Sequence, residues 1–138
     1  MTKTWMLVAA VAGSACLGGF AMAGRRTPGQ TVSITKITAS GYMGAARNSA
    51  DNDQELGCLI NASVSVGTFV TCWARDQYGN SATCVNTEPS LEMLAAIGSI
   101  TSSSAIRFEW TYPGPSGFTS PMCDVIQVAN SSANELPR

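Results

Sequence analysis

The chain contains no histidine among its 138 residues. Histidine is the commonest general base, the usual partner of serine and cysteine nucleophiles, and a frequent ligand of zinc and copper. Lysine is nearly as scarce, since only Lys3 and Lys36 occur. No glycine-rich phosphate loop precedes an expected helix. Few types of catalytic site can be built without these residues. We therefore predict a protein that is not an enzyme and uses no cofactor.

Charge is also sparse. Charged residues make up 12% of the chain and the formal net charge is −1. A nucleic-acid-binding domain usually carries a clustered basic patch, and a membrane-surface segment usually shows a basic amphipathic pattern. Neither pattern occurs here. We therefore expect no nucleic-acid partner and, once the N-terminal segment is removed, no membrane association.

Residues 1–23 have the pattern of a secretory signal peptide. Lys3 precedes an apolar run that starts at Met6, and Ala21-Met22-Ala23 forms an A-x-A cleavage site. Cleavage would leave about 115 residues, enough for one domain, with a net charge near −2. An uncleaved anchor and lipidation at Cys16 are less favoured alternatives. The pattern predicts a secreted or periplasmic protein.

Four cysteines follow this segment: Cys58, Cys72, Cys84 and Cys123. Exported proteins fold where thiols oxidise, so disulfides are expected, and four cysteines allow three pairings. A zinc site is disfavoured because no Cys-x-x-Cys pair occurs.

Three β segments surround the first three of these cysteines: Leu56–Ser65, Thr68–Arg75 and Ser81–Val85. The joints around Val66-Gly67 and residues 76–80 contain glycine and asparagine, which favour tight turns. Such segments form an antiparallel meander. Side chains alternate between the faces of a strand, so the cysteines share an apolar face.

The register of this meander leaves the disulfide pairing open. Cys58 and Cys72 are symmetric about position 65, and Cys72 and Cys84 are symmetric about position 78. All three can therefore stand side by side. We favour Cys72–Cys84 with Cys58–Cys123; the alternative is Cys58–Cys72 with Cys84–Cys123.

A helix is predicted from Thr87 to Gly98. Thr87 is a suitable N-cap, Pro89 falls in the first turn and Gly98 is a stop signal. Leu91, Leu94 and Ala95 lie at helical spacing and should cover the apolar face of the meander.

The remaining segments complete a β-rich α+β fold with a C-terminal hairpin and two disulfides. We predict strands at Thr31–Ala39, Ala105–Tyr112 and Met122–Ala129, a helical turn at Ala45–Arg47, a loop at Pro113–Pro121, and flexible tails at residues 24–30 and 130–138. Residues 31–129 then form a single domain.

Aromatic side chains supply the main candidate for a ligand surface. Trp73 and Arg75 fall on the more polar face of the meander, while Tyr78 and Tyr112 lie at the ends of strands. Exposed aromatic residues commonly contact a sugar or a protein partner. Trp110 instead alternates with Ile106 and Phe108 and is expected in the core.

Acidic residues supply weaker candidates. Asp51, Asp53 and Glu55 alternate in a loop and could bind calcium, although the twelve-residue calcium-loop pattern is absent and a solvated loop is favoured. Glu109 and Asp124 could approach each other across the last hairpin as an acid pair. A surface charge cluster of Glu109 with Arg107 is the simpler interpretation.

Several motifs occur together: Gly44-Ala45-Ala46-Arg47-Asn48-Ser49-Ala50-Asp51 followed by Gln54 and then Gly57-Cys58, Cys72-x-Ala74-Arg75, Ser81-Ala82-x-Cys84, and an aromatic strand followed by Cys123. In combination they resemble a family of short exported bacterial proteins of uncharacterised function. The resemblance covers Tyr42 to Val128 and implies a bacterial source and a shared disulfide-bearing fold. It implies no activity.

These features together predict a secreted, non-enzymatic binding or structural module with an unknown protein or glycan partner. One alternative is an inhibitor of a secreted hydrolase that acts through the Pro113–Pro121 loop. Another is a subunit of an extracellular filament, self-assembled through an open strand edge at Thr31–Ala39. A small hydrolase built on carboxylates is a third.

Overall fold

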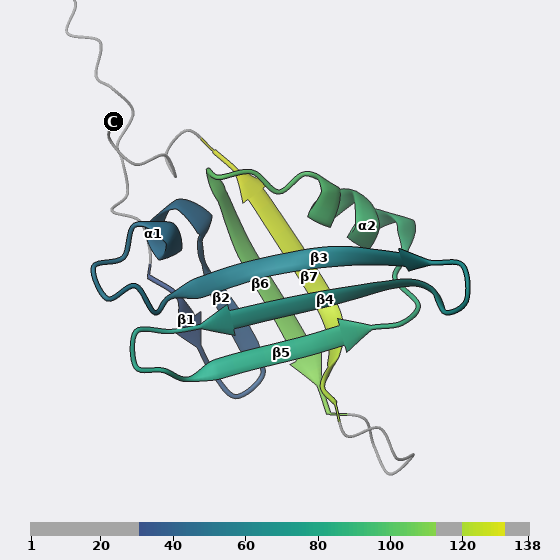
Figure 1. Ribbon diagram of the computed structural model, residues 1–138, viewed down its shortest axis with the longest axis horizontal. Coiled ribbons are helices and arrows are strands. Elements are labelled where there is room, and N and C mark those ends of the chain that lie inside the picture. Colours follow the sequence, from purple (N-terminus) through teal and green to yellow (C-terminus); the bar gives the residue numbers. More distant parts are fainter. Residues whose placement is uncertain (1–30, 113–119, 132–138) are drawn as a thin grey trace, which may run out of the picture.

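The computed structural model describes residues 31–112 and 120–131, and within these ranges the chain forms seven strands and two helices (Figure 1). The predicted signal peptide, the tail at residues 24–30, residues 113–119 of the predicted loop and the tail from residue 132 onward lie outside the described residues. The elements are β1 (Ser33–Ile34), β2 (Thr38–Tyr42), α1 (Met43–Arg47), β3 (Glu55–Ser63), β4 (Gly67–Arg75), β5 (Ser81–Asn86), α2 (Leu91–Gly98), β6 (Ser104–Thr111) and β7 (Met122–Asn130).

The described strands form one sheet in the order β1-β2-β6-β7-β5-β4-β3. Neighbouring strands are antiparallel except β5 and β7, which meet in parallel at the single pair Val85 and Met122. The predicted β-rich α+β fold, with a meander (β3, β4, β5), a C-terminal hairpin (β6, β7) and two disulfides, is confirmed.

The sheet folds over at the narrow β5–β7 junction, so the meander crosses in front of β2, β6 and β7 (Figure 1). Side chains between these two halves form the core. The largest fully buried ones are Phe108, Ile106 and Val70, and Trp110 is only 4% exposed. The halves approach closely, because a Cβ added to Gly41 of β2 would lie 3.3 Å from Leu56 of β3. The predicted core position of Trp110 is thus confirmed.

The register predicted from cysteine spacing is confirmed. Cys58 pairs with Cys72, and Cys72 pairs with Cys84, so the three residues stand in a row across the meander. Gly67 and Gly79 at the two turns have φ of 81° and 80°, a region that favours glycine.

The favoured disulfide pairing, however, is wrong. The structure joins Cys58 to Cys72 and Cys84 to Cys123, which is the alternative pairing. Cys123 follows Met122, whose partner in β5 is Val85, and this parallel contact places Cys123 beside Cys84. Cys72 is left to bond its other neighbour, Cys58.

The single strand predicted at Thr31–Ala39 is also wrong. This segment contains the two-residue β1, a turn and the start of β2, which continues to Tyr42. The turn is held by Thr35, whose hydroxyl donates to Thr38 O and accepts from Thr38 N. A threonine hydroxyl can hold a turn that lacks glycine and proline. The predicted helical turn at Ala45–Arg47 is confirmed as part of α1.

The helix α2 begins later than predicted. Its N-cap is Ser90, not Thr87, and the Ser90 hydroxyl accepts a hydrogen bond from Met93 N at 3.2 Å. The helix packs against β7 and the end of β3 through Ile97, Met93 and Leu94. Leu91, predicted in the apolar stripe, is 80% exposed.

Replacing Ser90 with alanine should lower the free energy of unfolding by about 1 kcal/mol, because one amide of the first turn loses its acceptor. Urea unfolding followed by circular dichroism measures the difference. Thr87→Ala is the matched control and should change stability by less than about 0.5 kcal/mol. A larger loss for Thr87→Ala would contradict the observed cap.

The C-terminal hairpin extends one residue beyond its predicted end. Asn130 was predicted in a flexible tail, but it belongs to β7, pairs with Ser104 and donates through Nδ2 to Ser99 O at 3.0 Å. Asn130 Oδ1 also accepts a hydrogen bond from the buried Ser104 hydroxyl. Polar contacts of a buried group therefore fix this strand end.

Candidate functional site

The outer face of the meander carries Trp73 on its middle strand. Trp73 on β4 lies between Gly57 on β3 and Thr83 on β5. Its six-membered ring rests against Gly57, since a Cβ added there would lie 2.8 Å from Trp73 Cζ2. Gly57 is consequently buried, while Trp73 remains half-buried. The absence of a side chain at residue 57 is what allows this ring to lie on the sheet.

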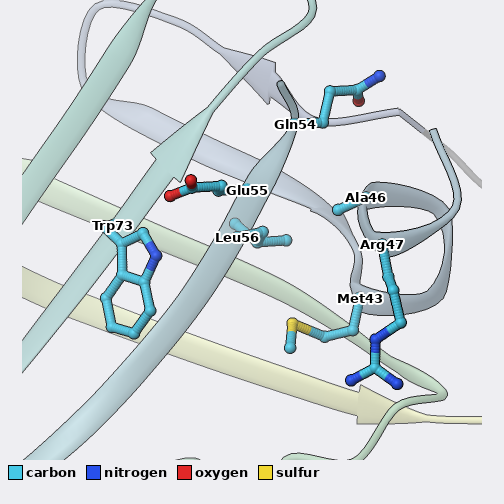
Figure 2. A pocket seen from close by; sticks show the side chains of 7 residues that line it. All are labelled: Met43, Ala46, Arg47, Gln54, Glu55, Leu56 and Trp73. Atoms are coloured by element: carbon cyan, nitrogen blue, oxygen red, sulfur yellow. The ribbon is translucent and has the colours of Figure 1, made fainter. Parts of the chain in front are cut away.

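A pocket of about 210 Å³ opens between Trp73 and helix α1 (Figure 2). Its lining consists of Met43, Ala46, Arg47, Gln54, Glu55, Leu56 and Trp73. In Figure 2 the Glu55 carboxylate extends toward the Trp73 side, and Arg47 descends from α1 on the opposite side. The pocket thus combines an aromatic ring with two opposite charges.

Hydrogen bonds around Gln54 hold the wall of this pocket. Gln54 is buried, and its Oε1 accepts from Val32 N at 2.8 Å. Its Nε2 donates to Asp51 Oδ2 at 2.8 Å, and Asp51 Oδ1 accepts from the amides of Asp53 and Gln54. The Gln54 side chain and these amides hold the pKa of the Asp51 carboxyl below its usual value.

The structure does not bring the calcium candidates together. In residues 31–112 and 120–131 no three histidine, cysteine or acidic side chains converge on one point. Asp51 uses both oxygens within its own loop, whereas Glu55 begins β3 and lines the pocket. Asp51 therefore serves to hold the Gln54 side chain in place by a hydrogen bond.

The four residues predicted for the ligand surface do not form one cluster. Trp73 and Arg75 share the outer face, where Arg75 stands opposite Glu55. Tyr78 lies in the β4–β5 turn and is 80% exposed. Tyr112, 65% exposed, follows β6 and lines a different cavity, together with Thr83 and Trp110.

Asp76 fixes the turn that carries Tyr78. Its side chain is buried, Oδ1 accepts from Tyr78 N and Asn80 N at 2.9 Å each, and Oδ2 accepts from Asn80 Nδ2 at 2.8 Å. The Asn80 side chain and the two backbone amides hold the pKa of Asp76 below its ordinary value of 3.8.

Stability should therefore fall in acid. A carboxyl whose pKa is lower in the folded state stabilises that state above about pH 4, and the contribution disappears as pH falls through the folded pKa. We expect the free energy of unfolding to decrease as the pH falls below about 4. The decrease should be smaller for Asp76→Asn than for the wild type in urea titrations. Equal decreases in the two proteins would contradict this role of Asp76.

Glu109, one member of the proposed acid pair at the last hairpin, is instead paired with Arg107. Glu109 accepts from Arg107 Nη2 at 2.5 Å, which matches the surface charge cluster. The register of β6 and β7 shifts between Glu109 and Trp110, so Asp124 has no partner residue in β6.

Neither helix in the described part of the chain is long and apolar enough to cross a membrane. No family model, curated protein or solved structure matches the chain. The resemblance to short exported bacterial proteins therefore stays a prediction.

Sequence reasoning missed Arg47, Gln54 and Met43 as neighbours of Trp73. Arg47 stood in one of the quoted motifs and Glu55 among the calcium candidates, but nothing in their spacing joined them to Trp73. Only the packing of α1 beside the start of β3 brings them together.

Proposed function

We propose that the protein is exported and acts as a non-enzymatic binding module whose ligand is a glycan held at Trp73. The observation that carries this proposal is the half-buried Trp73 ring on Gly57, at the edge of a pocket with Arg47 and Glu55. An aromatic ring offers a large, rigid apolar surface to the C–H groups of a sugar ring. Charged side chains beside it can hydrogen-bond sugar hydroxyls.

Export is supported by the leader-like segment at residues 1–23 and by the two disulfides. Disulfides form and persist mainly in oxidising compartments such as the periplasm and the cell exterior. Each engages cysteines that would otherwise be reactive thiols.

A binding role is favoured over catalysis by how the reactive side chains are used. All four cysteines of the described residues are in disulfides, Glu109 is paired with Arg107, and Asp51 and Asp76 hold their own loops. The chain has no histidine that could act as a general base.

Affinity electrophoresis and fluorescence titration against soluble bacterial and plant polysaccharides test the proposal. We expect at least one glycan to retard the protein and to shift its tryptophan fluorescence. Trp73→Ala should abolish both effects, and Arg47→Gln should weaken them several-fold. Tyr78→Ala, an exposed aromatic residue in the β4–β5 turn, is the matched control and should bind normally. Binding that survives Trp73→Ala would rule out this surface.

Self-assembly is a second candidate, favoured by β3. Within the predicted edge at Thr31–Ala39, the edge strand is the two-residue β1, whereas β3 is a nine-residue edge strand in the described sheet. Leu59 and Ile60 in its middle are 39% and 40% exposed. A long edge can pair with another chain. Electron microscopy should then show filaments that disappear in Leu59→Lys, because a charge on an edge strand opposes pairing.

The inhibitor alternative rests on residues 113–121, most of which lie outside the described residues. It stays a prediction. Shortening this loop should abolish co-purification with a hydrolase and leave glycan binding at Trp73 intact.

A further inference from the structure

Two opposite charges flank the Trp73 pocket, and neither is neutralised by the rest of the described protein. Arg47, in the last turn of α1, and Glu55, the first residue of β3, are both exposed and lie on opposite sides of the pocket (Figure 2). Within residues 31–112 and 120–131 the one ion pair joins Arg107 to Glu109, and no hydrogen bond engages the side chain of Arg47 or Glu55. Both charged groups are therefore available to a ligand.

Arg75 does not neutralise Glu55, although the two residues stand directly opposite each other on β4 and β3. They form no ion pair, and Arg75 does not belong to the lining of the pocket. In Figure 2 the Glu55 carboxylate instead extends toward the Trp73 side. Glu55 is consequently the anionic group of the pocket, and Arg75 is an arginine on the same face that lies outside it.

The indole N–H of Trp73 is a further polar group that a ligand can reach. Its Nε1 makes no hydrogen bond to any described residue, and the one unpaired side-chain polar atom that is shielded from solvent belongs to Trp110. Trp73 Nε1 is therefore accessible, and Figure 2 shows it on the side of the ring that faces Glu55 and Leu56. A group in the pocket can accept a hydrogen bond from it.

Apolar side chains line the pocket together with these polar groups. Leu56 and Ala46 are buried members of the core, and Met43 packs against that core. The pocket volume of about 210 Å³ is below the range of drug-sized ligand sites. The pocket therefore suits one sugar unit rather than an oligosaccharide.

The two charges call for two different groups on that sugar unit. A carboxylate beside an aromatic ring favours an ammonium group, because the carboxylate and the face of the ring both attract positive charge. The guanidinium of Arg47, on the opposite side, favours a phosphate or a carboxylate, which can accept two parallel hydrogen bonds from it. A sugar that complements both sides carries a positive group and a negative group far apart on its ring.

We infer that the Trp73 pocket selects a zwitterionic amino sugar, whose free amine binds at Glu55 and Trp73 and whose anionic group binds at Arg47. The apolar part of the ring then lies against Leu56 and Met43. This inference rests on the proposed binding of a glycan at Trp73 and names the chemical class of that glycan.

Nuclear magnetic resonance of the ¹⁵N-labelled protein tests this inference with four related sugars. Glucosamine 6-phosphate carries both charges, on opposite sides of the ring, at about pH 6, where its amine is protonated. It should shift the assigned Trp73 indole N–H with a saturating curve and a Kd on the order of 1 mM. Glucosamine and N-acetylglucosamine 6-phosphate each lack one charge and should bind at least about threefold more weakly. N-acetylglucosamine, which has neither charge, should bind most weakly.

Two substitutions at exposed positions assign each charge of the sugar to its partner. Glu55→Gln should raise the Kd of the two sugars with a free amine at least about threefold and leave the two N-acetylated sugars unchanged. Arg47→Gln should do the same to the two phosphates and leave the two uncharged at C6 unchanged. Arg75→Gln is the matched control, because it removes the same charge from the same face outside the pocket. It should leave the preference for phosphate unchanged.

The results separate this inference from the proposed function. Equal Kd values for the four sugars, or a preference for the zwitterion that survives Glu55→Gln or Arg47→Gln, would overturn the inference and leave glycan binding standing. A preference for phosphate that disappears in Arg75→Gln would overturn it as well. The same holds if a polysaccharide shifts the Trp73 indole N–H and none of the four sugars does. If no sugar and no polysaccharide shifts it, the proposed function is contradicted together with the inference.

Discussion

Removing the Cys84–Cys123 disulfide with the double substitution C84A/C123A should lower the free energy of unfolding by about 4 kcal/mol. The residues joined are 39 apart in sequence, and closing so long a loop restricts the unfolded chain strongly. Both side chains are fully buried, so alanine avoids placing a hydroxyl in the core.

The Cys58–Cys72 disulfide is the matched control. It spans 14 residues within one hairpin, and C58A/C72A should lower the free energy of unfolding by about 3 kcal/mol. Unlike Cys84–Cys123, it joins strands that are already paired along nine residue pairs. β5 and β7, by contrast, share a single pair in the described sheet.

Urea unfolding of the oxidised proteins measures both losses, and a peptide map without reduction checks the pairing. Fragments that contain Cys84 and Cys123 should be linked. A larger loss of unfolding free energy for C58A/C72A would mean that packing, rather than the Cys84–Cys123 disulfide, holds the two halves of the sheet together.

Gly57→Val should weaken glycan binding at least about tenfold, which is about 1.4 kcal/mol, because the new side chain occupies the place of the Trp73 ring. Trp73 can swing toward solvent, so we expect the free energy of unfolding to fall by no more than about 1–2 kcal/mol. The tryptophan emission should shift to longer wavelength.

Two comparisons isolate the contact. In a Trp73→Ala background, Gly57→Val should cause no further loss of stability, since the two residues act as a pair. Gly98→Ala, at the end of α2, places a Cβ where nothing lies within 4 Å and should leave binding unchanged. If Gly57→Val binds like the wild type, the position of the ring on the sheet is irrelevant to binding.

Local patterns were sufficient for the meander. Turn glycines and two-residue alternation predicted every end of β3, β4 and β5 to within two residues, and the cysteine spacing predicted their register. Turn geometry and side-chain alternation are properties of neighbouring residues, which a sequence displays directly. The N-terminal hairpin was missed because its turn uses Thr35 in place of glycine.

The disulfide pairing depended on a feature that alternation could not predict. Counting back from the inward Ile126 by twos would point Asp124 inward and Cys123 outward. The irregularity beside Asp124 changes this alternation, so Trp110 pairs with Cys123 and both are buried. Bulges of this kind reorient side chains. Cys123 thereby reaches Cys84 and leaves Cys72 to Cys58.

The sequence by itself determined the strand-rich class, the cysteines that share a face of the meander and the position of Trp73 on the opposite face. Tertiary structure alone decided the disulfide partners, the pocket of Trp73 with Arg47, and the buried, unpaired indole N–H of Trp110. The physical reason is that these contacts join segments far apart in the chain. Their proximity follows from how the sheet folds over at the β5–β7 junction and from where α1 packs, which no local pattern encodes.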